Sequence, residues 1–294
     1  MKECDSKTVL VSGASGLLGS ALLSRLDERA EVTAICRSKP VTGRHLVTDL
    51  SSNWSLSQLP QRVDTVIHLA QSEKFRNFPA SAKEVFDVNV VSLQRLLDYA
   101  KRARAERFII ASSGGVYGFG EKPFAEEMEV RQRGDLGFYL GTKICAEILA
   151  ENYSSFFKVI VLRFFFIYGP RQRRDMLMPR LAQSVREGRP IQLQGAEGIR
   201  TNPVYVDDAA ASVMTALDLD ESQRINVAGA EVLSLRQIAV ELGEAVGREP
   251  CFEVDAKAES RHLVGDISRM RALLGAPKVS FAEGIRRMLD TGTA

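Results

Sequence analysis

The stretch "TVLVSGASGLLGS", residues 8–20, decides the fold, because an apolar run leads through glycines into a helical pattern. Gly13, Gly16 and Gly19 are spaced as G-x-x-G-x-x-G. Glycines between a strand and a helix let the backbone approach a pyrophosphate, which binds at the helix N-terminus where free N–H groups point outward. An ordinary glycine turn is the alternative. The strand before the glycines and the amphipathic helix after them favour a dinucleotide-binding loop.

Short β-rich segments alternate with longer helical patterns beyond this loop. Further strands are expected at "EVTAIC" (31–36), "HLVTDL" (45–50), "DTVIHLA" (64–70), "RFIIASS" (107–113) and "KVIVLRFFFIYG" (158–169), with helices at 16–29, 81–103 and 138–153. Most of these strands are continuously apolar, as in a parallel sheet that is covered on both faces. The pattern predicts an α/β fold, a doubly wound parallel sheet of the Rossmann type. Ligands bind such sheets at the carboxyl ends of the strands.

The texture changes after Pro170, where a basic stretch is followed by short strands and further helices. We expect a dinucleotide-binding domain over residues 1–170, with a return of the chain around 203–228. Residues 171–294 would then form mainly a smaller, C-terminal substrate-binding lobe. Its expected strands are "IQLQG" (191–195), "RINVAG" (224–229) and "CFEVD" (251–255), and Ser234 is the expected N-cap of a helix over 234–247.

The composition excludes several classes of protein. The 294 residues carry a net charge of +2 with acids and bases interleaved, which argues against binding to nucleic acid or to a membrane surface. No apolar run is long enough to span a bilayer, and no signal peptide is recognised at the N-terminus, so a cytoplasmic protein is expected. The four cysteines are far apart without a C-x-x-C pair, and neither a metal site nor a disulfide framework is expected.

The helix expected at 138–153 carries Tyr139 and Lys143, four residues apart. Such residues are neighbours on a helix surface, and a nearby positive charge lowers the pKa of a phenol. Taken alone, the pair is explained as well by a solvated lysine beside a half-buried tyrosine.

Several further motifs follow in order along the chain. They are "VTDL" (47–50), "VIHLAQS" (66–72), similar to V-I-H-L-A-A, Asn89 in "DVNVVSL", "IIASSGGVYG" (109–118), similar to S-S-x-x-V-Y-G, "LRFFFIYGPRQ" (162–172), similar to L-R-x-x-N-V-Y-G-P-R, "VYVDDAA" (204–210) and "INVAGAEVLSLRQIA" (225–239). With Y-x-x-x-K, this set resembles the extended short-chain dehydrogenases/reductases, the NAD(P)-dependent epimerase/dehydratase family of nucleotide-sugar enzymes.

The resemblance implies roles for individual residues. Tyr139 would move a proton to or from a sugar hydroxyl during hydride transfer, and Lys143 would lower its pKa and bind the nicotinamide ribose. Ser113 would donate a hydrogen bond to the reacting oxygen. Cofactor contacts are implied for Gly13, Ser15, Gly16, Leu17, Leu18, Gly19, Arg37, Asp49, Leu50, Leu69, Ala70, Gln71, Asn89, Tyr139, Lys143 and Phe166, and substrate contacts for Ser113, Tyr139, Arg180 and Arg200. Pairing of the helices near 82–104 and 138–153 with those of a second copy implies a homodimer.

Four departures from the family pattern bear on function. Gly114 and Gly115 stand where 4,6-dehydratases carry Asp-Glu, which disfavours that reaction. Phe166 replaces an Asn that contacts the nucleotide sugar. The diphosphate-binding Arg falls on Thr201, with Arg200 one residue earlier; Arg171, Arg173, Arg174 and Arg180 are other candidates.

The fourth departure concerns the dinucleotide. Cys36 stands where NAD-binding relatives carry an acidic residue, and Arg37 follows. An acidic residue there binds the ribose hydroxyls, whereas an Arg accommodates a 2′-phosphate. The pair favours NADP over NAD by a small margin.

The sequence therefore predicts an NAD(P)-dependent epimerase or 4-ketoreductase acting on a nucleotide-linked sugar. A carbonyl reductase of a non-sugar substrate is an alternative, favoured by Phe166. A non-catalytic NAD(P)-sensing regulator is another, but Ser113, Tyr139 and Lys143 are all present, which favours an enzyme.

Overall fold

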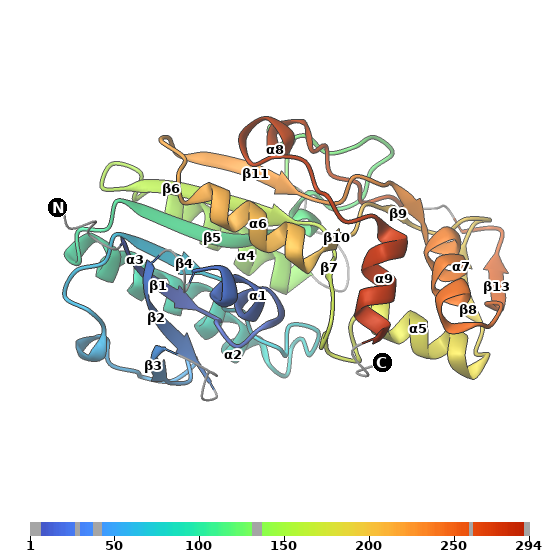
Figure 1. The fold of residues 1–294 in the computed structure, drawn as a ribbon, viewed down its shortest axis with the longest axis horizontal. Helices are drawn as coiled ribbons and strands as arrows, with labels where there is room; N and C mark the ends of the chain where they lie inside the picture. The colour runs from blue at the N-terminus through green and yellow to red at the C-terminus, as the bar shows by residue number, and fades with distance from the viewer. Residues whose placement is uncertain (1–6, 27–29, 38–42, 131–136, 259–260, 291–294) are drawn as a thin grey trace. The chain divides into compact units, whose positions relative to one another are not determined.

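The computed structural model describes residues 7–26, 30–37, 43–130, 137–258 and 261–290 (Figure 1). The chain forms two compact units. The first consists of Met1–Val116, Val130–Arg163 and Ala210–Ile225, and the second of Tyr117–Glu129, Phe164–Ala209 and Asn226–Ala294. The first unit was expected to extend to residue 170, but it ends at Arg163 before its return. The returning segment, Ala210–Ile225, is shorter than the expected 203–228.

A seven-stranded sheet organises the first unit, in the order β11-β6-β5-β4-β1-β2-β3. The strands are β1 (Lys7–Ser12), β2 (Ala30–Cys36), β3 (Arg44–Val47), β4 (Thr65–His68), β5 (Arg107–Ser113), β6 (Lys158–Phe164) and β11 (Gln223–Val227). The four strand pairs β1–β2, β2–β3, β1–β4 and β4–β5 are all parallel. Strand order reverses between β1 and β4, the point at which such sheets bind ligands. The predicted Rossmann-type α/β fold is confirmed.

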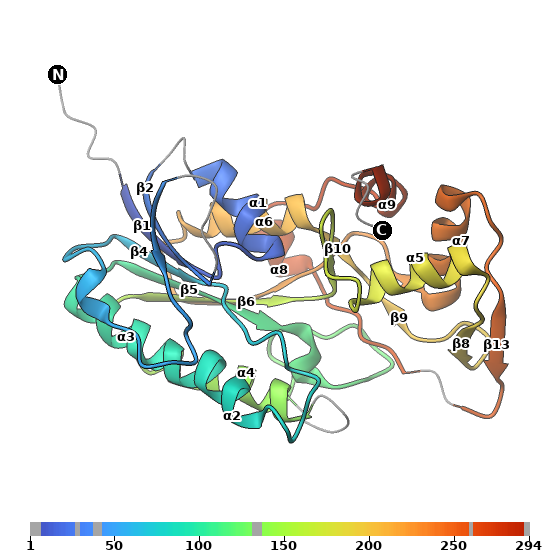
Figure 2. The same cartoon turned by 90° about the horizontal axis from the view of Figure 1, so that it is seen from below.

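Helices cover both faces of this sheet (Figure 2). On one face lie α1 (Leu17–Leu26) and the part of α6 (Val206–Ala216) that belongs to this unit; on the other lie α2 (Ala82–Phe86), α3 (Ser92–Arg102) and α4 (Gly137–Glu151). Leu93, Leu96 and Phe108, all 0% exposed, belong to the core between α3, α4 and the strands. Burial on both faces explains the continuously apolar strands.

Three expectations about elements need correction. The helix expected over 81–103 is interrupted by a π-helical turn, η2 (Asp87–Val91), between α2 and α3. The strand expected over 158–169 is broken after Phe164, because Phe166 has a φ of 44°, which no strand residue adopts; β7 (Ile167–Tyr168) follows. The segment "RINVAG" lies at the end of the return expected around 203–228 and not with the strands of the smaller lobe, because its residues contribute to β11, which pairs with β6 at the edge of the main sheet.

The second unit combines short strand pairs with helices. Its helices are α5 (Leu177–Glu187), α7 (Leu235–Val246), α8 (Ser268–Leu273) and α9 (Phe281–Asp290), and its pairs are β7 with β10 (Val204–Tyr205), β9 (Arg200–Thr201) with β12 (Leu233–Ser234), and β8 (Ile191–Gln194) with β13 (Phe252–Asp255). Ser234 is the N-cap of α7, as predicted, and forms a capping box with Gln237.

Membrane spans and metal clusters are both absent from the part of the chain that the structure describes. None of the helices described is long and apolar enough to cross a membrane. Within the same residues, no group of three or more His, Cys, Asp or Glu side chains is placed to hold a metal ion.

Candidate active site

The glycine loop between β1 and α1 packs closely against neighbouring backbone. Gly13 has a φ of 75°, and a Cβ there would lie 2.6 Å from the Ala70 nitrogen. A Cβ on Gly19 would lie 2.2 Å from the Gly13 carbonyl oxygen, so α1 packs directly on the loop. Gly16 and Ser15 are exposed, Leu17 is half-buried and Leu18 is buried. The exposed backbone at Ser15 and Gly16 and the N–H groups of the first turn of α1 fit a dinucleotide pyrophosphate.

Three predicted catalytic residues gather where β5 ends beside α4. Ser113 is the last residue of β5, and Tyr139 and Lys143 lie one turn apart on α4. Tyr139 is 9% exposed and Lys143 5% exposed. The Gly115 N–H donates to Ser113 Oγ over 3.1 Å, and Ser113 forms a hydrogen bond with the Tyr139 hydroxyl. Because the Tyr139 hydroxyl gives its single hydrogen to Gln71 Oε1, Ser113 is the donor in its bond with the phenol oxygen.

Burial dominates the proton equilibria of this group. Burial raises the pKa of Tyr139 above its usual value, and the hydrogen bond from Ser113 opposes that rise. Burial also lowers the pKa of Lys143 to about 8, which the nearby Glu147 opposes. Lys143 Nζ donates to the Ala111 carbonyl oxygen over 2.9 Å and lies 5.9 Å from the Tyr139 ring centroid. Lys143 does not contribute the lowering of the phenol pKa that the spacing predicts: burial is the dominant cause, and the phenol is protonated.

A buried ion pair fixes the helix that carries Tyr139 and Lys143. Arg163 of β6 donates to both carboxylate oxygens of Glu147 on α4, over 3.0 and 2.6 Å. Ser112, the neighbour of Ser113, also donates to Glu147. Arg163 is 2% exposed and Glu147 3% exposed, so a bidentate pair here is shielded from solvent. The pair ties the register of α4 to the end of β5.

The segment after β4 reaches the phenol of Tyr139. The Tyr139 hydroxyl donates to Gln71 Oε1 over 2.9 Å, and the Phe75 ring centroid lies 4.9 Å from the Tyr139 ring centroid. Gln71 was predicted only as a cofactor contact, and Phe75 was not predicted at all, because no spacing rule links this segment to α4. Leu69 and Ala70, two further predicted cofactor contacts, are half-buried just after β4.

Asn89 is projected from the π-helical turn into the interior. Its side chain is 2% exposed, accepts from the Ser72 N–H over 3.0 Å and donates to Thr142 Oγ1 over 2.9 Å. In this structure the predicted cofactor contact Asn89 therefore links the segment after β4 to α4. Insertions of this kind in helices occur frequently at functional sites.

The ends of β2 and β3 carry the residues predicted to meet the adenosine. Cys36 is 3% exposed, and the Arg37 guanidinium forms an ion pair with Glu73. Asp49 Oδ1 accepts from the backbone N–H and the hydroxyl of Ser51 over 2.9 and 2.8 Å, and these bonds lower the pKa of Asp49. Leu50 is buried. Glu73 is an acidic partner that the sequence did not reveal.

His68 is a core histidine with a hydrogen-bond partner. It is 3% exposed, and its Nδ1 lies 2.7 Å from the Oγ of buried Ser12. Burial lowers the pKa of His68 to about 3, so the ring is neutral. The bond joins the carboxyl ends of β1 and β4.

The remaining predicted contacts belong to the second unit. Phe166 is half-buried, and Arg180 and Arg200 are exposed. Thr201, next to Arg200 on β9, is 0% exposed with its Oγ1 unpaired. Arg200 is thus exposed and Thr201 buried, as expected for neighbours in an extended chain, whose side chains alternate between faces.

The chain was compared with known proteins. The family model "NAD dependent epimerase/dehydratase family" matches residues 9–228. A probable UDP-glucuronate 4-epimerase of Rhizobium meliloti is 27% identical, covering 96% of this chain and 95% of that protein. The solved structure of MoeE5 in complex with UDP-glucuronic acid and NAD is 28% identical with a TM-score of 0.85, covering 97% of this chain and 98% of that chain. A UDP-glucuronic acid 4-epimerase from Bacillus cereus in complex with UDP-glucuronic acid and NAD is 27% identical with a TM-score of 0.84 over the same shares.

The matched region contains the glycine loop, Ser113, Tyr139 and Lys143, and extends over most of the chain. The chain belongs to the NAD-dependent epimerase/dehydratase family.

Proposed function

We propose that this member of the family is an NAD-dependent epimerase that inverts C4 of a UDP-linked sugar, with UDP-glucuronic acid as the first substrate to test. One observation carries the proposal: Ser113, Tyr139 and Lys143 converge at the edge of the sheet that also carries the glycine loop. Two solved neighbours hold UDP-glucuronic acid together with NAD.

The residues of the chain would perform the proton chemistry. Bound NAD would supply hydride exchange with the sugar carbon. Tyr139 would take the proton of the C4 hydroxyl and later return it, while Ser113 would donate to the same oxygen. Lys143 would leave the Ala111 carbonyl, bind the nicotinamide ribose and place its charge near the phenol, which lowers the pKa of Tyr139 from its raised resting value.

We propose NAD as the cofactor. The preference for NADP drawn from Arg37 finds no support among these neighbours, which hold NAD. In this chain the Glu73 carboxylate already pairs with Arg37 and would repel a 2′-phosphate. Glu73→Gln should therefore strengthen NADPH binding by roughly three- to tenfold with little effect on NADH, as for one exposed charge contact. Titration of both reduced cofactors checks this; an equal change for both would remove Glu73 from cofactor selection.

A 4,6-dehydratase is disfavoured by the two glycines after Ser113. A Cβ on Gly115 would lie 2.9 Å from Leu140 Cδ2 and 3.3 Å from Ser113 Oγ. A carboxylate side chain at this position would have to displace Leu140 beside the catalytic tyrosine. The chain thus lacks the acid and base at this position that removal of water needs.

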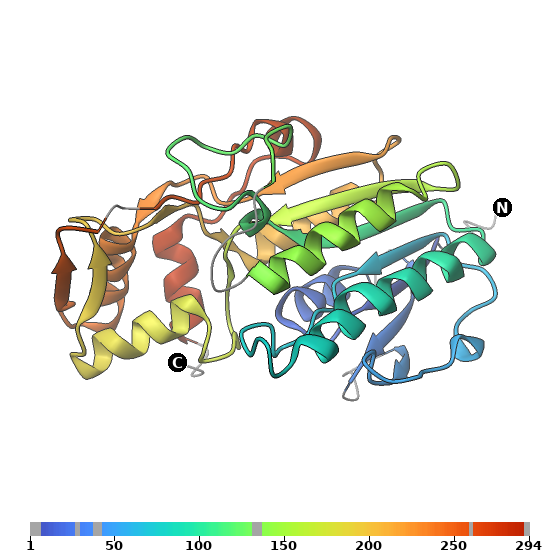
Figure 3. The ribbon, with the colours of Figure 1, turned by 180° about the vertical axis from the view of Figure 1, so that it is seen from behind.

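A homodimer through the helical face of the first unit is also proposed. Helices α3 and α4 lie alongside one another on that face (Figure 3). On these helices Val85, Val88, Leu93 and Leu96 are buried within the subunit. Ile148, Phe86 and Val91 are 54%, 43% and 39% exposed. Sedimentation of Ile148→Lys beside the unmodified protein tests this; a monomer in both contradicts it.

The test of the activity uses the purified protein without added cofactor. Denaturation should release NAD, and incubation with UDP-glucuronic acid should give its C4 epimer by nuclear magnetic resonance. UDP-glucose serves as a second candidate sugar. An absence of any epimer, together with NADPH oxidation on a 4-keto nucleotide sugar, would make the protein a 4-ketoreductase instead.

A further inference from the structure

The phenol oxygen of Tyr139 has two polar neighbours with opposite effects. Ser113 donates to it, which favours the phenolate, whereas Gln71 Oε1 accepts its proton over 2.9 Å. An amide carbonyl oxygen has no hydrogen to give, so this bond exists only with the protonated phenol. Gln71 therefore favours the neutral form of the residue that has to act as a base.

The position of Gln71 is fixed by the segment that carries it. Its neighbour Ser72 donates its backbone N–H to Asn89, and Asn89 donates to Thr142 on α4. Thr142 in turn donates to the Tyr139 carbonyl oxygen over 2.6 Å. The chain of bonds runs from the segment after β4 to the backbone of Tyr139 itself. Gln71 is exposed, yet it projects from an anchored backbone.

The charged groups around Tyr139 are otherwise accounted for. On α4 itself Lys143 lies 5.9 Å from the ring centroid, and from β4 His68 is neutral because burial lowers its pKa. On α2, Glu84 pairs with Lys74 over 2.7 Å. In the π-helical turn, Asp87 pairs with Lys83 over 2.5 Å. From β5, Ser112 donates to Glu147, which Arg163 binds. The only partner described that accepts the phenol proton is Gln71.

We propose that Gln71 is a further residue of the catalytic centre, which holds the hydroxyl proton of Tyr139 in the resting protein and sets the pH at which the tyrosine can act as a base. The inference rests on the proposed acid–base role of Tyr139. Substrate binding would replace the Gln71 carbonyl by a sugar hydroxyl, and the charge of Lys143 would then favour release of the phenol proton.

A direct measurement of Tyr139 ionisation tests this without substrate. A fluorinated tyrosine at position 139 ionises at lower pH than tyrosine, within the range where proteins stay folded, and its fluorine resonance reports that ionisation. The variants are Gln71→Ala, Gln71→Met and Gln71→Glu in this background, with circular dichroism to verify the fold. Alanine is also the residue that the motif V-I-H-L-A-A carries at this position. Methionine keeps the length of glutamine but lacks the amide acceptor, so it separates the hydrogen bond from the burial of the phenol.

The pH midpoint of the ionisation should fall by roughly 0.5–1 pH unit in both Gln71→Ala and Gln71→Met, as for loss of one hydrogen bond. It should rise in Gln71→Glu, whose carboxylate repels a phenolate. The pH at which kcat/KM rises, as Tyr139 loses its proton, should move in the same directions. An unchanged or raised midpoint in Ala and Met would overturn the proposal, and so would a fall in Ala alone, which would reflect lost burial. If the midpoints move as expected but no epimerisation is found, the proposed function fails and the proton contact stands.

Discussion

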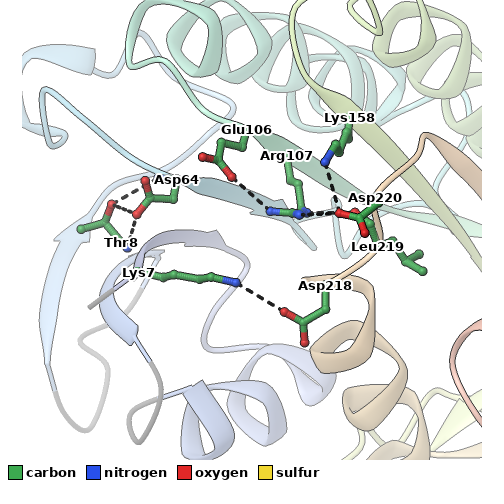
Figure 4. Close-up of polar contacts among 9 residues, drawn as sticks. All are labelled: Lys7, Thr8, Asp64, Glu106, Arg107, Lys158, Asp218, Leu219 and Asp220. Carbon is green, nitrogen blue, oxygen red and sulfur yellow. Dashed lines mark hydrogen bonds and ion pairs between the residues drawn. The ribbon is translucent and has the colours of Figure 1, made fainter. Parts of the chain in front are cut away.

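The two ends of strand β5 show how one sheet separates stability from chemistry. At its start, the Arg107 side chain is 9% exposed and donates to the Leu219 carbonyl oxygen over 3.1 Å, beside Glu106 and Asp220 at 3.4 and 3.7 Å (Figure 4). At its end, Lys143 and Tyr139 are equally buried, but they bond to neutral groups, a carbonyl oxygen, an amide and a hydroxyl.

The two ends differ in whether their buried polar side chains have partners of opposite charge. Around the start of β5, further ion pairs and hydrogen bonds link neighbouring segments: Lys7 with Asp218, Lys158 with Asp220, and Thr8 with Asp64. At the other end, a lysine has its pKa lowered and a tyrosine has its pKa raised by burial. Groups without a fixed counter-ion cost stability, and they are free to change their proton state during a reaction.

The largest effect is expected for Tyr139→Phe at the carboxyl end. The change keeps the ring and its contact with Phe75 but removes the hydroxyl. Turnover should fall by roughly a hundred- to ten-thousand-fold, as for loss of a positioned acid–base group. Cofactor affinity should hardly change. Steady-state kinetics and NAD titration measure both, and near-normal turnover at saturating substrate would take Tyr139 out of the mechanism.

The next effect is expected at the amino end, in Arg107→Met. The change leaves the Leu219 carbonyl without its donor and breaks contact with both acids. The free energy of unfolding should fall by about 1–3 kcal/mol, while kcat and KM stay unchanged. Lys158→Met is the matched control, because its amine lies 3.5 Å from the same Asp220 but is 37% exposed. Denaturant unfolding that shows equal losses in both variants would contradict a special role for Arg107.

The opposite sign is expected for Lys143→Met, which removes the buried charge at the carboxyl end. The variant no longer buries a charged amine, and this gain is only partly offset by the lost bond to the Ala111 carbonyl. The free energy of unfolding at neutral pH should therefore rise by about 1 kcal/mol. Activity should be lost.

The pH dependence of stability reports the protonation of Lys143 in the folded chain. Burial lowers its pKa from 10.5 to about 8, so between these values the unfolded chain holds a proton that the folded chain has released. The stability of the unmodified protein should therefore rise with pH across this window relative to Lys143→Met. A difference between the two proteins that is constant from pH 7 to beyond the upper value would mean that Lys143 titrates as if it were exposed.

The smallest effect is expected for Asp218→Asn at the amino end. The pair with Lys7 joins side chains that are 65% and 56% exposed over 3.4 Å. Solvent and salt screen such a pair, so its loss should cost less than about 0.5 kcal/mol. A larger loss in denaturant unfolding would show that the amino edge acts as a coupled network.

At the carboxyl end of β5 the sequence predicts which residues lie near one another on one helix or in one loop, but not the contacts between distant segments. The spacing of Tyr139 and Lys143 and the three glycines follows from local geometry, which sequence displays directly. The bond between Gln71 and Tyr139 and the pair of Arg37 with Glu73 join residues that are distant in the chain, so no periodicity reveals them. The place of β11 at the sheet edge likewise depends on pairing with β6, because a short apolar strand fits either unit.

Epimerisation in heavy water tests the proposed chemistry most directly. The protein is incubated with UDP-glucuronic acid in deuterium oxide, and the C4 epimer is analysed by nuclear magnetic resonance. Hydride transfer returns the substrate's own hydrogen to C4, so the epimer should carry protium there, and Tyr139→Phe should form almost none. Deuterium at C4 of the product, or the same rate of epimer formation in Tyr139→Phe, would contradict hydride transfer assisted by Tyr139.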